Sequence, residues 1–362
     1  LRGAAGVAAM LQQHGILPGE VVILVQQHGL GLVNSFFGAM LHGAIPAIMP
    51  FLTRKLSPEK YQADIHALME ITQPAAILTE AAFLELMQGL SGPQSSARAV
   101  IDIGACPELP TLPNLGLFSG PGRDAEEIVL LQHSSGTTGL QKGVALSHRA
   151  VIRQLDTYRE TLHLHPEDVI VSWLPLYHDM GLIAGFIMPV AQGVPLVLMS
   201  PFDWVVAPYR ILQAVSQYKG TLSWLPNFAY NFCAQKIRER DIAEVDLSSW
   251  RAISNCSEPM RWESHQQFYE RFKSKGLRYE ALTTCYAMAE NVFAVSQGGI
   301  DGPVQTLEVD AVTLINQRKL ASPETGKPAL TLLSAGKPVP NTQVRILGEH
   351  RRQLAEDEIG EI

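Results

Sequence analysis

Cysteine is scarce in this chain of 362 residues, which has only four of them. No two of them have the Cys-x-x-Cys spacing of a structural zinc site, and their wide separation gives no disulfide framework. We therefore expect neither feature, and a reducing cytoplasm fits this composition. The four residues are Cys106, Cys233, Cys256 and Cys285.

Charged residues are also few, at 17% of the chain, and the net charge is -7. Binding to a nucleic-acid backbone needs a basic face, and the chain has no Lys/Arg run longer than Arg351–Arg352, so we expect no nucleic-acid partner. The longest apolar stretch, Val33 to Leu52, contains polar residues and two prolines. We therefore expect a buried helix and strand there, without a membrane span or a preceding secretory signal.

The first part of the chain, up to about residue 104, alternates helical and strand patterns. Alternation of this kind predicts a mostly parallel sheet with helices on both faces. The expected helices are 1–13, 30–42, one opened by Ser57 and Pro58, and 81–90, and the expected strands are 21–25, 44–49, 76–78 and 100–103.

A second series of the same kind begins near residue 147. The expected helices are 148–162, 182–191, 204–218, 228–240 and 261–275, and the expected strands are 169–173, 195–199, 221–225, 250–254 and 280–284. A chain of 362 residues exceeds one ordinary core, so two or three packed units are expected. The predicted fold class is therefore α/β, with two similar, mostly parallel-sheet subdomains.

From residue 305 onward short strand patterns dominate, and 344–346 and 359–362 are the clearest of them. They predict the start of a small β-barrel subdomain. We expect four regions: a first α/β subdomain (1–146), a second one (147–300), an insertion or connector (301–333) and a truncated β-rich subdomain (334–362). Both ends of the chain fall inside an element pattern, so we expect a fragment of a longer protein.

One loop is rich in groups that bind phosphate. An apolar run, 128–131, predicts a buried strand that leads into His133-Ser-Ser-Gly-Thr-Thr-Gly139, with Lys142 and Gly143 close behind. Glycines let main-chain N–H groups form an anion nest, hydroxyls donate hydrogen bonds, and an ammonium group offsets charge. The loop is not a Walker loop, since 144–146 looks like a second strand and the order Gly-Lys-Ser/Thr is absent. A flexible hairpin tip is the alternative.

This loop resembles the phosphate loop of the acyl-adenylate-forming superfamily, which reads approximately (Y/T)-(T/S)-S-G-(T/S)-T-G-x-P-K-G. The chain departs from that pattern at Gln141, where proline is usual. The resemblance implies that Thr137 and Lys142 are catalytic. It implies that ATP is held by Ser134, Ser135, Gly136, Thr137, Thr138, Gly139 and Lys142.

Two further segments resemble fatty acyl-AMP ligases. Tyr177 to Leu182 reads YHDMGL and lies at a predicted strand-to-helix turn, where α/β proteins commonly bind ligands. The resemblance gives His178 a role in positioning the carboxylate, although a structural cap would also explain a His-Asp step. Pro226 to Tyr230 reads PNFAY, which flanks the acyl tunnel in those ligases, although core packing is the alternative. The implied substrate-binding residues are His178, Asp179, Met180, Gly181, Asn227 and Phe228.

Two segments resemble the family's nucleotide contacts. Asn255 to Pro259 matches the N-G-A-E-P segment that lies against adenine, with Cys256 in place of glycine. The segment from Thr284 matches Y-G-x-T-E, where tyrosine can stack on a purine and the glutamate, here Glu290, is a magnesium ligand and catalytic group. The implied nucleotide-binding residues are Ser257, Glu258, Pro259, Cys285, Tyr286, Ala287, Met288 and Ala289.

The implied reaction is attack of a fatty-acid carboxylate on the α-phosphorus of ATP, which gives an acyl-adenylate and pyrophosphate. The nucleophile is already ionised, so the protein has to orient two anions and neutralise charge, with Mg²⁺ as cofactor. The acyl acceptor that the family implies is an acyl carrier protein, or a polyketide or peptide synthase. The family's adenylating lysine and ribose-binding aspartate would lie beyond residue 362, so residues 1–362 alone should turn over slowly.

Two other functions stay open. The first is an acyl-coenzyme A ligase or another carboxylate-adenylating enzyme. Ala289, the PNFAY stretch and the long segment 297–333, which resembles an insertion thought to block transfer to coenzyme A, favour the adenylate-only enzyme. The second is a non-catalytic module that binds an acyl group or a nucleotide, and it is suggested by Gln141, Cys256 and Ala287.

Overall fold

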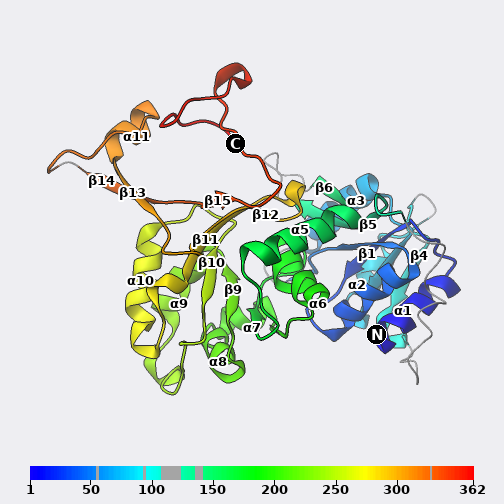
Figure 1. Ribbon diagram of the computed structural model, residues 1–362. Helices are drawn as coiled ribbons and strands as arrows, with labels where there is room; N and C mark the ends of the chain where they lie inside the picture. Colours follow the sequence, from blue (N-terminus) through cyan, green and yellow to red (C-terminus); the bar gives the residue numbers. More distant parts are fainter. Residues whose placement is uncertain (54–56, 93–94, 107–123, 135–141, 327) are drawn as a thin grey trace. The chain divides into compact units, whose positions relative to one another are not determined.

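The computed structural model describes residues 1–53, 57–92, 95–106, 124–134, 142–326 and 328–362. The chain divides into two compact units. Unit 1 comprises Leu1–Arg153, Pro175–Leu182 and Met199–Pro201, and unit 2 comprises Gln154–Leu174, Ile183–Leu198 and Phe202–Ile362. Each unit contains one large sheet, so the expected pair of α/β layers is present (Figure 1).

The sheet of unit 1 has the strand order β4-β3-β1-β2-β5-β6. All neighbours are parallel except β5 and β6, which form an antiparallel hairpin. The strands are β1 (Val21–Val25), β2 (Ile45–Ile48), β3 (Ala76–Thr79), β4 (Ala99–Asp102), β5 (Ile128–Ser134) and β6 (Lys142–Ser147). These strands are the ones that the sequence predicts: β1 has the predicted bounds, and the ends of the others differ from the prediction by up to three residues.

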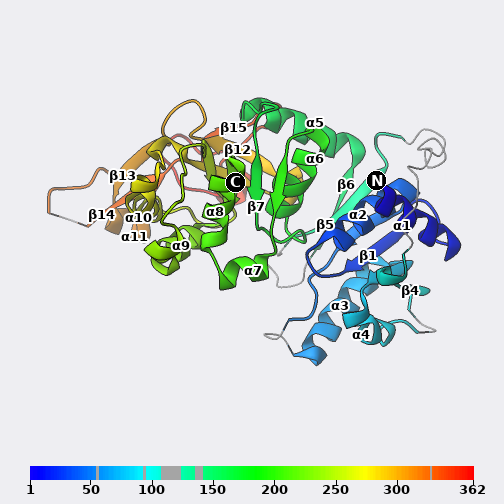
Figure 2. The ribbon, with the colours of Figure 1, turned by 90° about the horizontal axis from the view of Figure 1, so that it is seen from below.

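Helices cover both faces of this sheet, α1 and α2 on one side and α3 and α4 on the other (Figure 2). They are α1 (Arg2–Gln13), α2 (Leu30–His42), α3 (Pro58–Thr72) and α4 (Leu84–Gln88), the last preceded by a 3-10 turn, Ala81–Phe83. Helix α3 begins where the sequence predicts it, because the Ser57 hydroxyl accepts a hydrogen bond from the Lys60 N–H at 3.2 Å. Aliphatic side chains of α3, such as Ile65 and Leu68, pack on Ile23 and Ile77 of the sheet.

The sheet of unit 2 has the order β15-β12-β11-β10-β9-β7-β8. It is parallel from β8 to β11, and β12 and β15 add antiparallel strands. The strands are β7 (Ile170–Ser172), β8 (Leu196–Leu198), β9 (Leu222–Leu225), β10 (Ala252–Asn255), β11 (Leu282–Ala287), β12 (Ala294–Gly298) and β15 (Lys337–Pro338).

The helices around this sheet differ in part from the prediction. Helix 204–218 is two helices, because Pro208 has no N–H to continue the first one. The segment expected as helix 182–191 is a π-helix, Met180–Ile187, followed by α6. The helices are α5 (His148–Thr161), α6 (Met188–Gln192), α7 (Pro201–Val206), α8 (Tyr209–Tyr218), α9 (Asn227–Lys236) and α10 (Trp262–Phe272), and Figure 1 shows α9 and α10 side by side against β9 to β11.

The expected strands 344–346 and 359–362 are wrong. Leu347 forms only isolated bridges, with Gln353 and with Glu361, because no neighbouring segment of the described chain runs beside it for several residues. The segment expected as an insertion forms an arm of β13 (Thr306–Asp310), α11 (Ala311–Gln317) and β14 (Ala329–Leu333), with the two strands antiparallel (Figure 1). No closed barrel is present among the described residues.

No helix in the described ranges combines the length and the apolar character that crossing a membrane requires. All four cysteines lie in the described part of the chain, and none of them forms a disulfide.

Candidate functional site

The predicted phosphate loop connects the two strands of the β5–β6 hairpin in unit 1. Ser134 ends β5 and Lys142 begins β6, and the two residues pair in the antiparallel ladder. The predicted order of strand, loop and strand is therefore confirmed for the backbone on either side of the loop. The predicted loop residues Ser135, Gly136, Thr137, Thr138, Gly139 and Gln141 lie outside the described residues.

The segment with His178 and Asp179 forms a tight turn that ends in the π-helix beginning at Met180. His178 Nδ1 lies 2.5 Å from Asp179 Oδ1, and the Met180 N–H donates to the same carboxylate oxygen at 2.7 Å. The Met180 N–H also lies 3.3 Å from His178 Nδ1, but the shorter contact to the carboxylate fits a proton on Nδ1. The His178 side chain is 44% exposed, whereas that of Asp179 is 10% exposed. A largely buried carboxylate therefore orients a partly exposed imidazole.

Asp179 also raises the pKa of His178. Burial alone would lower the pKa of this imidazole, but the hydrogen bond and the charge of Asp179 outweigh burial and raise the pKa above its ordinary value. The imidazole therefore stays protonated to a higher pH than it would without Asp179. Gly181, the next predicted substrate-binding residue, is buried in the π-helix.

In unit 2, three predicted segments leave the same edge of the sheet. Asn255, at the end of β10, lies opposite Leu225 of β9 on one side and Thr284 of β11 on the other. Because these strands are parallel, the loops that follow them start side by side. The PNFAY segment, the Asn255–Pro259 segment and the segment from Cys285 to Glu290 are therefore neighbours, as the resemblance requires.

Asn227 ties two of these segments together. Its side-chain oxygen accepts hydrogen bonds from Asn255 Nδ2 and from the Arg261 N–H, each at 3.0 Å. Its amide nitrogen donates to the Ser264 hydroxyl at 3.1 Å. Asn227 is only 7% exposed, and these partners use most of its hydrogen-bonding capacity. Its side chain therefore holds the loop between β10 and α10 in place.

Phe228 and Glu258 make a second tie between the same segments. The Phe228 N–H, in the first turn of α9, donates to Glu258 Oε2 at 2.8 Å. Glu258 itself is exposed, as are its neighbours Ser257 and Pro259. Ser257 has φ +69, a conformation that costs energy for a residue other than glycine and that this loop nevertheless adopts. The buried Cys256 lies before it, where the family pattern has glycine.

The ring of Phe228 belongs to an aromatic wall. Trp173, which follows β7, and Trp204 of α7 stack with ring centroids 3.5 Å apart, and both are buried. Phe228 meets both rings edge-on, at 6.3 and 6.1 Å between centroids, and remains 46% exposed. An exposed aromatic edge on a buried stack is an apolar surface that an alkyl chain can cover. Sequence reasoning did not name Trp204 as part of this wall, because nothing in its neighbourhood marks a ligand contact.

The segment after Thr284 turns sharply. The pairing of β11 with β12 shifts register between Tyr286 and Ala287, and a 3-10 turn, Ala289–Asn291, follows. Val292 then has φ +66, which is unusual for a β-branched residue. Cys285 and Ala289 are buried, Tyr286 and Ala287 are half-buried, and Met288 and Glu290 are exposed. The bulge therefore presents Glu290 at the surface of the sheet edge.

Glu290 has the chemistry of a magnesium ligand. Its carboxylate forms no hydrogen bond or ion pair with the described residues, and Mg²⁺ in nucleotide sites takes one or two carboxylates together with phosphate oxygens and waters. No group of three or more His, Cys, Asp or Glu side chains that could hold a metal occurs in the described ranges. Glu290 thus fits an ion that arrives with the nucleotide and does not fit a site made of protein ligands alone.

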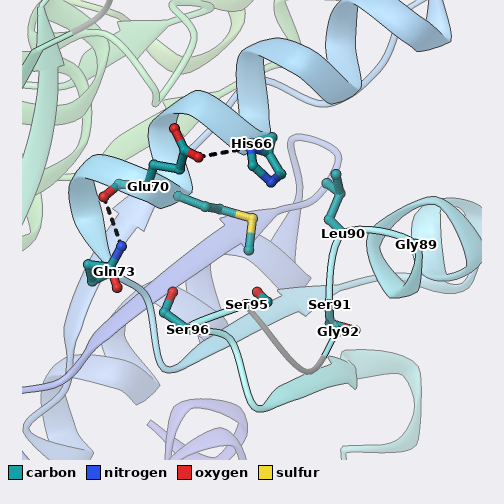
Figure 3. Close-up of a pocket in the computed structure, with 10 residues that line it drawn as sticks. His66, Glu70, Gln73, Gly89, Leu90, Ser91, Gly92, Ser95 and Ser96 are labelled. Carbon is teal, nitrogen blue, oxygen red and sulfur yellow. Dashed lines mark hydrogen bonds and ion pairs between the residues drawn. The ribbon is translucent and has the colours of Figure 1, made fainter.

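Two cavities lie elsewhere. One of about 580 Å³ in unit 1 is lined by residues of α3 and of the segment after α4 (Figure 3). Its lining residues His66 and Glu70 form an ion pair at 3.7 Å, and both side chains are exposed. The other, of about 530 Å³, lies in unit 2 near Gly299 and Lys337. Neither cavity is lined by a residue that the sequence predicts for the site.

The two sheets with parallel centres and helices around them define an α/β protein. A family model described as AMP-binding enzyme matches residues 2–362, and the chain belongs to this family. It is 30% identical over 365 residues to the medium-chain-fatty-acid–acyl-carrier-protein ligase JamA of Moorena producens (strain JHB), covering 99% of this chain and 61% of JamA.

Two other relatives are similar. A putative fatty-acid–CoA ligase, fadD21 of Mycobacterium leprae (strain TN), is 30% identical over 346 residues, which cover 92% of this chain and 57% of that protein. The crystal structure of a fatty acyl-adenylate ligase from L. pneumophila, in complex with acyl adenylate and pyrophosphate, is 29% identical with a TM-score of 0.87. That match covers 99% of this chain and 61% of the Legionella chain. The expected resemblance to fatty acyl-AMP ligases is thus confirmed, and the chain spans about three fifths of these relatives.

Proposed function

We propose that the protein activates a fatty acid with ATP, which forms an acyl-adenylate and releases pyrophosphate. It then passes the acyl group to an acyl carrier protein, or to a polyketide or peptide synthase. Both steps take place in the cytoplasm. The observation that carries the proposal is the arrangement of the segments after β9, β10 and β11 on one edge of the sheet. Membership of the AMP-binding family and the names of the relatives support it.

The proposed roles follow from residue chemistry. Main-chain N–H groups of residues 134–139 and the hydroxyls of Thr137 and Thr138 bind the phosphates, and Lys142 neutralises their charge. Tyr286 stacks on adenine, and main-chain atoms of 257–259 and 285–289 also contact the adenine. Asn227 and Phe228 border the acyl chain. His178, oriented by Asp179, holds the carboxylate through Nε2, and Met180 and Gly181 are the neighbouring substrate-binding residues. Since the attacking carboxylate is already ionised, no base is required.

Glu290 would hold Mg²⁺, which supplies positive charge to the phosphates when bound. The protein's own part is to present one exposed carboxylate at the edge where the nucleotide segments meet. Glu290→Gln keeps the size of the side chain and removes its charge. In the intact protein we expect this change to raise the magnesium concentration needed for half-maximal pyrophosphate release at least tenfold, with little change in Tm.

The test is pyrophosphate release by the intact protein with ATP and a panel of fatty acids. Acid-dependent release supports the proposal, and absence of release with every acid contradicts it. Residues 1–362 alone should bind nucleotide and turn over slowly, because they span only about three fifths of the relatives that they match. Full activity of that chain alone would show this expectation to be wrong.

A fatty-acid–CoA ligase is the second candidate, and the name of the Mycobacterium leprae relative favours it. Addition of coenzyme A to the same reaction separates the two. Abundant acyl-coenzyme A, detected by mass spectrometry, would support the second candidate, whereas adenylate that persists until an acyl carrier protein is added supports the first. A module that only binds its ligands would show a ligand-dependent Tm and no pyrophosphate.

A further inference from the structure

Helix α9 lacks a cap of its own. Its N-cap residue is Pro226, whose side chain cannot accept a hydrogen bond from the first turn. The cap comes instead from another loop, because the exposed Glu258 carboxylate accepts from the Phe228 N–H at 2.8 Å. A carboxylate at this end of a helix also interacts favourably with the helix dipole. The orientation of the start of α9 therefore depends on a residue thirty positions away in sequence.

The loop that contains Glu258 is tied to α9 at three points. Asn255 at its start and Arg261 at its end both donate to the Asn227 side chain, and Glu258 in its middle accepts from Phe228. All three bonds end on two consecutive residues of α9. A displacement of the loop therefore displaces the first turn of α9, and the reverse also holds.

The side chains that connect this loop to α9 belong to a buried, hydrogen-bonded cluster. Asn255 Nδ2 also donates to His265 Nε2 at 3.1 Å, and His265 is 1% exposed. Burial lowers the pKa of His265 to about 4, so the ring is neutral at physiological pH and carries its proton on Nδ1. The His265 ring stacks on Tyr230 of α9 with centroids 5.1 Å apart. Loop, α9 and α10 thus share one buried polar cluster.

The two ends of the connection face different ligands in the proposed reaction. Phe228 is the exposed edge of the aromatic wall and borders the acyl chain, while the segment 257–259 borders adenine. We propose that Glu258 is a positioning residue that couples the two: it holds Phe228 in register with the nucleotide segment, so that binding of nucleotide increases the affinity for the acid. This inference rests on the proposed function, and it assigns Glu258 to coupling instead of direct contact with the nucleotide.

Coupling is measurable as a ratio of dissociation constants. In the intact protein, calorimetry would give Kd for dodecanoate in the absence and in the presence of α,β-methylene-ATP with Mg²⁺. We expect the nucleotide to lower this Kd about tenfold, in the usual range for coupled sites. By reciprocity, dodecanoate should lower the Kd of the ATP analogue by the same factor.

Glu258→Ala removes the carboxylate and should reduce the coupling factor to below about twofold. Glu258→Gln keeps an acceptor oxygen without the charge and should retain an intermediate factor, about threefold to fivefold, which also tests the idea if the alanine variant does not fold. In a Phe228→Ala background, Glu258→Ala should cause no further loss of acid affinity, because the ring through which Glu258 acts is already absent.

Glu263→Ala is the matched control. Glu263 is an exposed carboxylate in the first turn of the neighbouring helix α10 and forms no hydrogen bond with the described residues. Its removal should leave the coupling factor at the wild-type value. A merely structural role for Glu258 would lower Tm and leave the ratio of dissociation constants unchanged, and that result would overturn the inference.

The outcomes also separate this inference from the proposed function. Acid-dependent pyrophosphate release by the wild-type protein, together with a coupling factor that Glu258→Ala does not change, overturns only the inference. A wild-type protein whose dodecanoate affinity is indifferent to the nucleotide does the same. Absence of pyrophosphate release and of binding for every acid in the panel overturns both.

Discussion

The two large sheets have similar strand arrangements and differ in the side chains that are buried around them. Each has a parallel centre and an antiparallel hairpin on one side of it, β5–β6 at the edge of the sheet in unit 1 and β11–β12 next to the edge strand β15 in unit 2. Both hairpins carry residues predicted to meet the nucleotide. The largest fully buried side chains of unit 1 are Leu11, Ile23 and Phe36, whereas those of unit 2 include three tryptophans, Trp204, Trp224 and Trp250.

Buried polar groups make the larger difference. In unit 2 the Tyr158 hydroxyl accepts from Trp224 Nε1 at 2.9 Å and donates to Gln297 at 2.8 Å, under the hairpin that ends in the Glu290 turn. Asn227, Asn255 and His265 form a second network. Unit 1 is mostly aliphatic, with smaller ties such as Thr79 Oγ1 to the Val25 carbonyl. A satisfied polar network specifies one arrangement of loops, and it makes the loss of a single partner expensive.

The largest effect is expected for Asn227→Ala in unit 2. The change removes the acceptor of the Arg261 N–H and one of the two acceptors of the buried Asn255 amide, which keeps His265 Nε2. We expect a loss of about 4 kcal/mol in the free energy of unfolding, since each unsatisfied buried donor costs about 1–3 kcal/mol. Urea titration would measure it.

Asn231→Ala, one turn further along α9, is the control. Asn231 is half-buried and makes one hydrogen bond, to Ser264 at 3.1 Å. Because alanine favours the helix, its net cost should be below about 1 kcal/mol. Equal losses for the two variants would show that the network does not carry the stability of this edge.

Acid should destabilise unit 2 through His265. Burial lowers its folded-state pKa to about 4, whereas an unfolded chain has about 6.5, so the unfolded chain takes up more protons between these values. The stabilisation is fully present above pH 6.5 and is lost as the pH falls to 4, on the order of 3 kcal/mol. His265→Gln keeps an acceptor for Asn255 and should flatten that dependence.

His133 is the counterpart of His265 in unit 1, because burial lowers its pKa to about 4 as well. All five tryptophans lie in unit 2, so tryptophan fluorescence reports the unfolding of that unit, whereas circular dichroism reports both. If the units unfold separately, His133→Gln should change the acid dependence seen by circular dichroism alone. A change of the same size in fluorescence would mean that the two units unfold together.

Two buried tyrosines give a smaller, matched pair. Tyr158→Phe leaves two buried partners unsatisfied in unit 2, and we expect a loss of about 2 kcal/mol. Tyr61→Phe in unit 1 removes one bond, from the hydroxyl to the Pro50 carbonyl at 2.8 Å, and should cost about 1 kcal/mol. Thermal unfolding of both variants measures the difference, and a larger loss for Tyr61→Phe would reverse the comparison.

The smallest effect is expected at the surface of unit 1. Arg98 pairs with Glu20, and their side chains are 44% and 28% exposed. Solvent screens such a pair, so Arg98→Ala should cost less than about 1 kcal/mol. The loss should shrink further in concentrated salt, and a loss above that of Asn227→Ala would contradict the ranking.

Much of the fold was predictable from local patterns. Strand Val21–Val25 and helix Leu30–His42 have the predicted bounds, because a short apolar run and a helical repeat followed by Gly43 at φ +92 are complete local signals. The start of the π-helix was not predictable, since its hydrogen bonds depend on how the buried segment from Met180 packs. The strand at 344–346 failed because a strand pattern forms a ladder only where a partner runs beside it.

The candidate site was likewise predictable in part from the sequence. Each of the motifs at β9, β10 and β11 was recognisable in the sequence, and parallel pairing of these strands brings them to one edge. The role of Asn227 as a tie was not foreseeable from its neighbours in sequence, because its partners lie at positions 255, 261 and 264. Trp204 joins Trp173 through packing between a helix and a strand end, which no local pattern encodes.

By itself, the amino-acid sequence determined most of the helices and strands of the two large sheets and which side chains are available at the strand ends, since both follow from interactions between residues close in the chain. Only the tertiary structure decided that Glu258 caps α9 and that Asp179 orients His178 from a buried position. Such roles depend on the register of neighbouring strands and on exclusion of water, and both arise only when distant segments pack together.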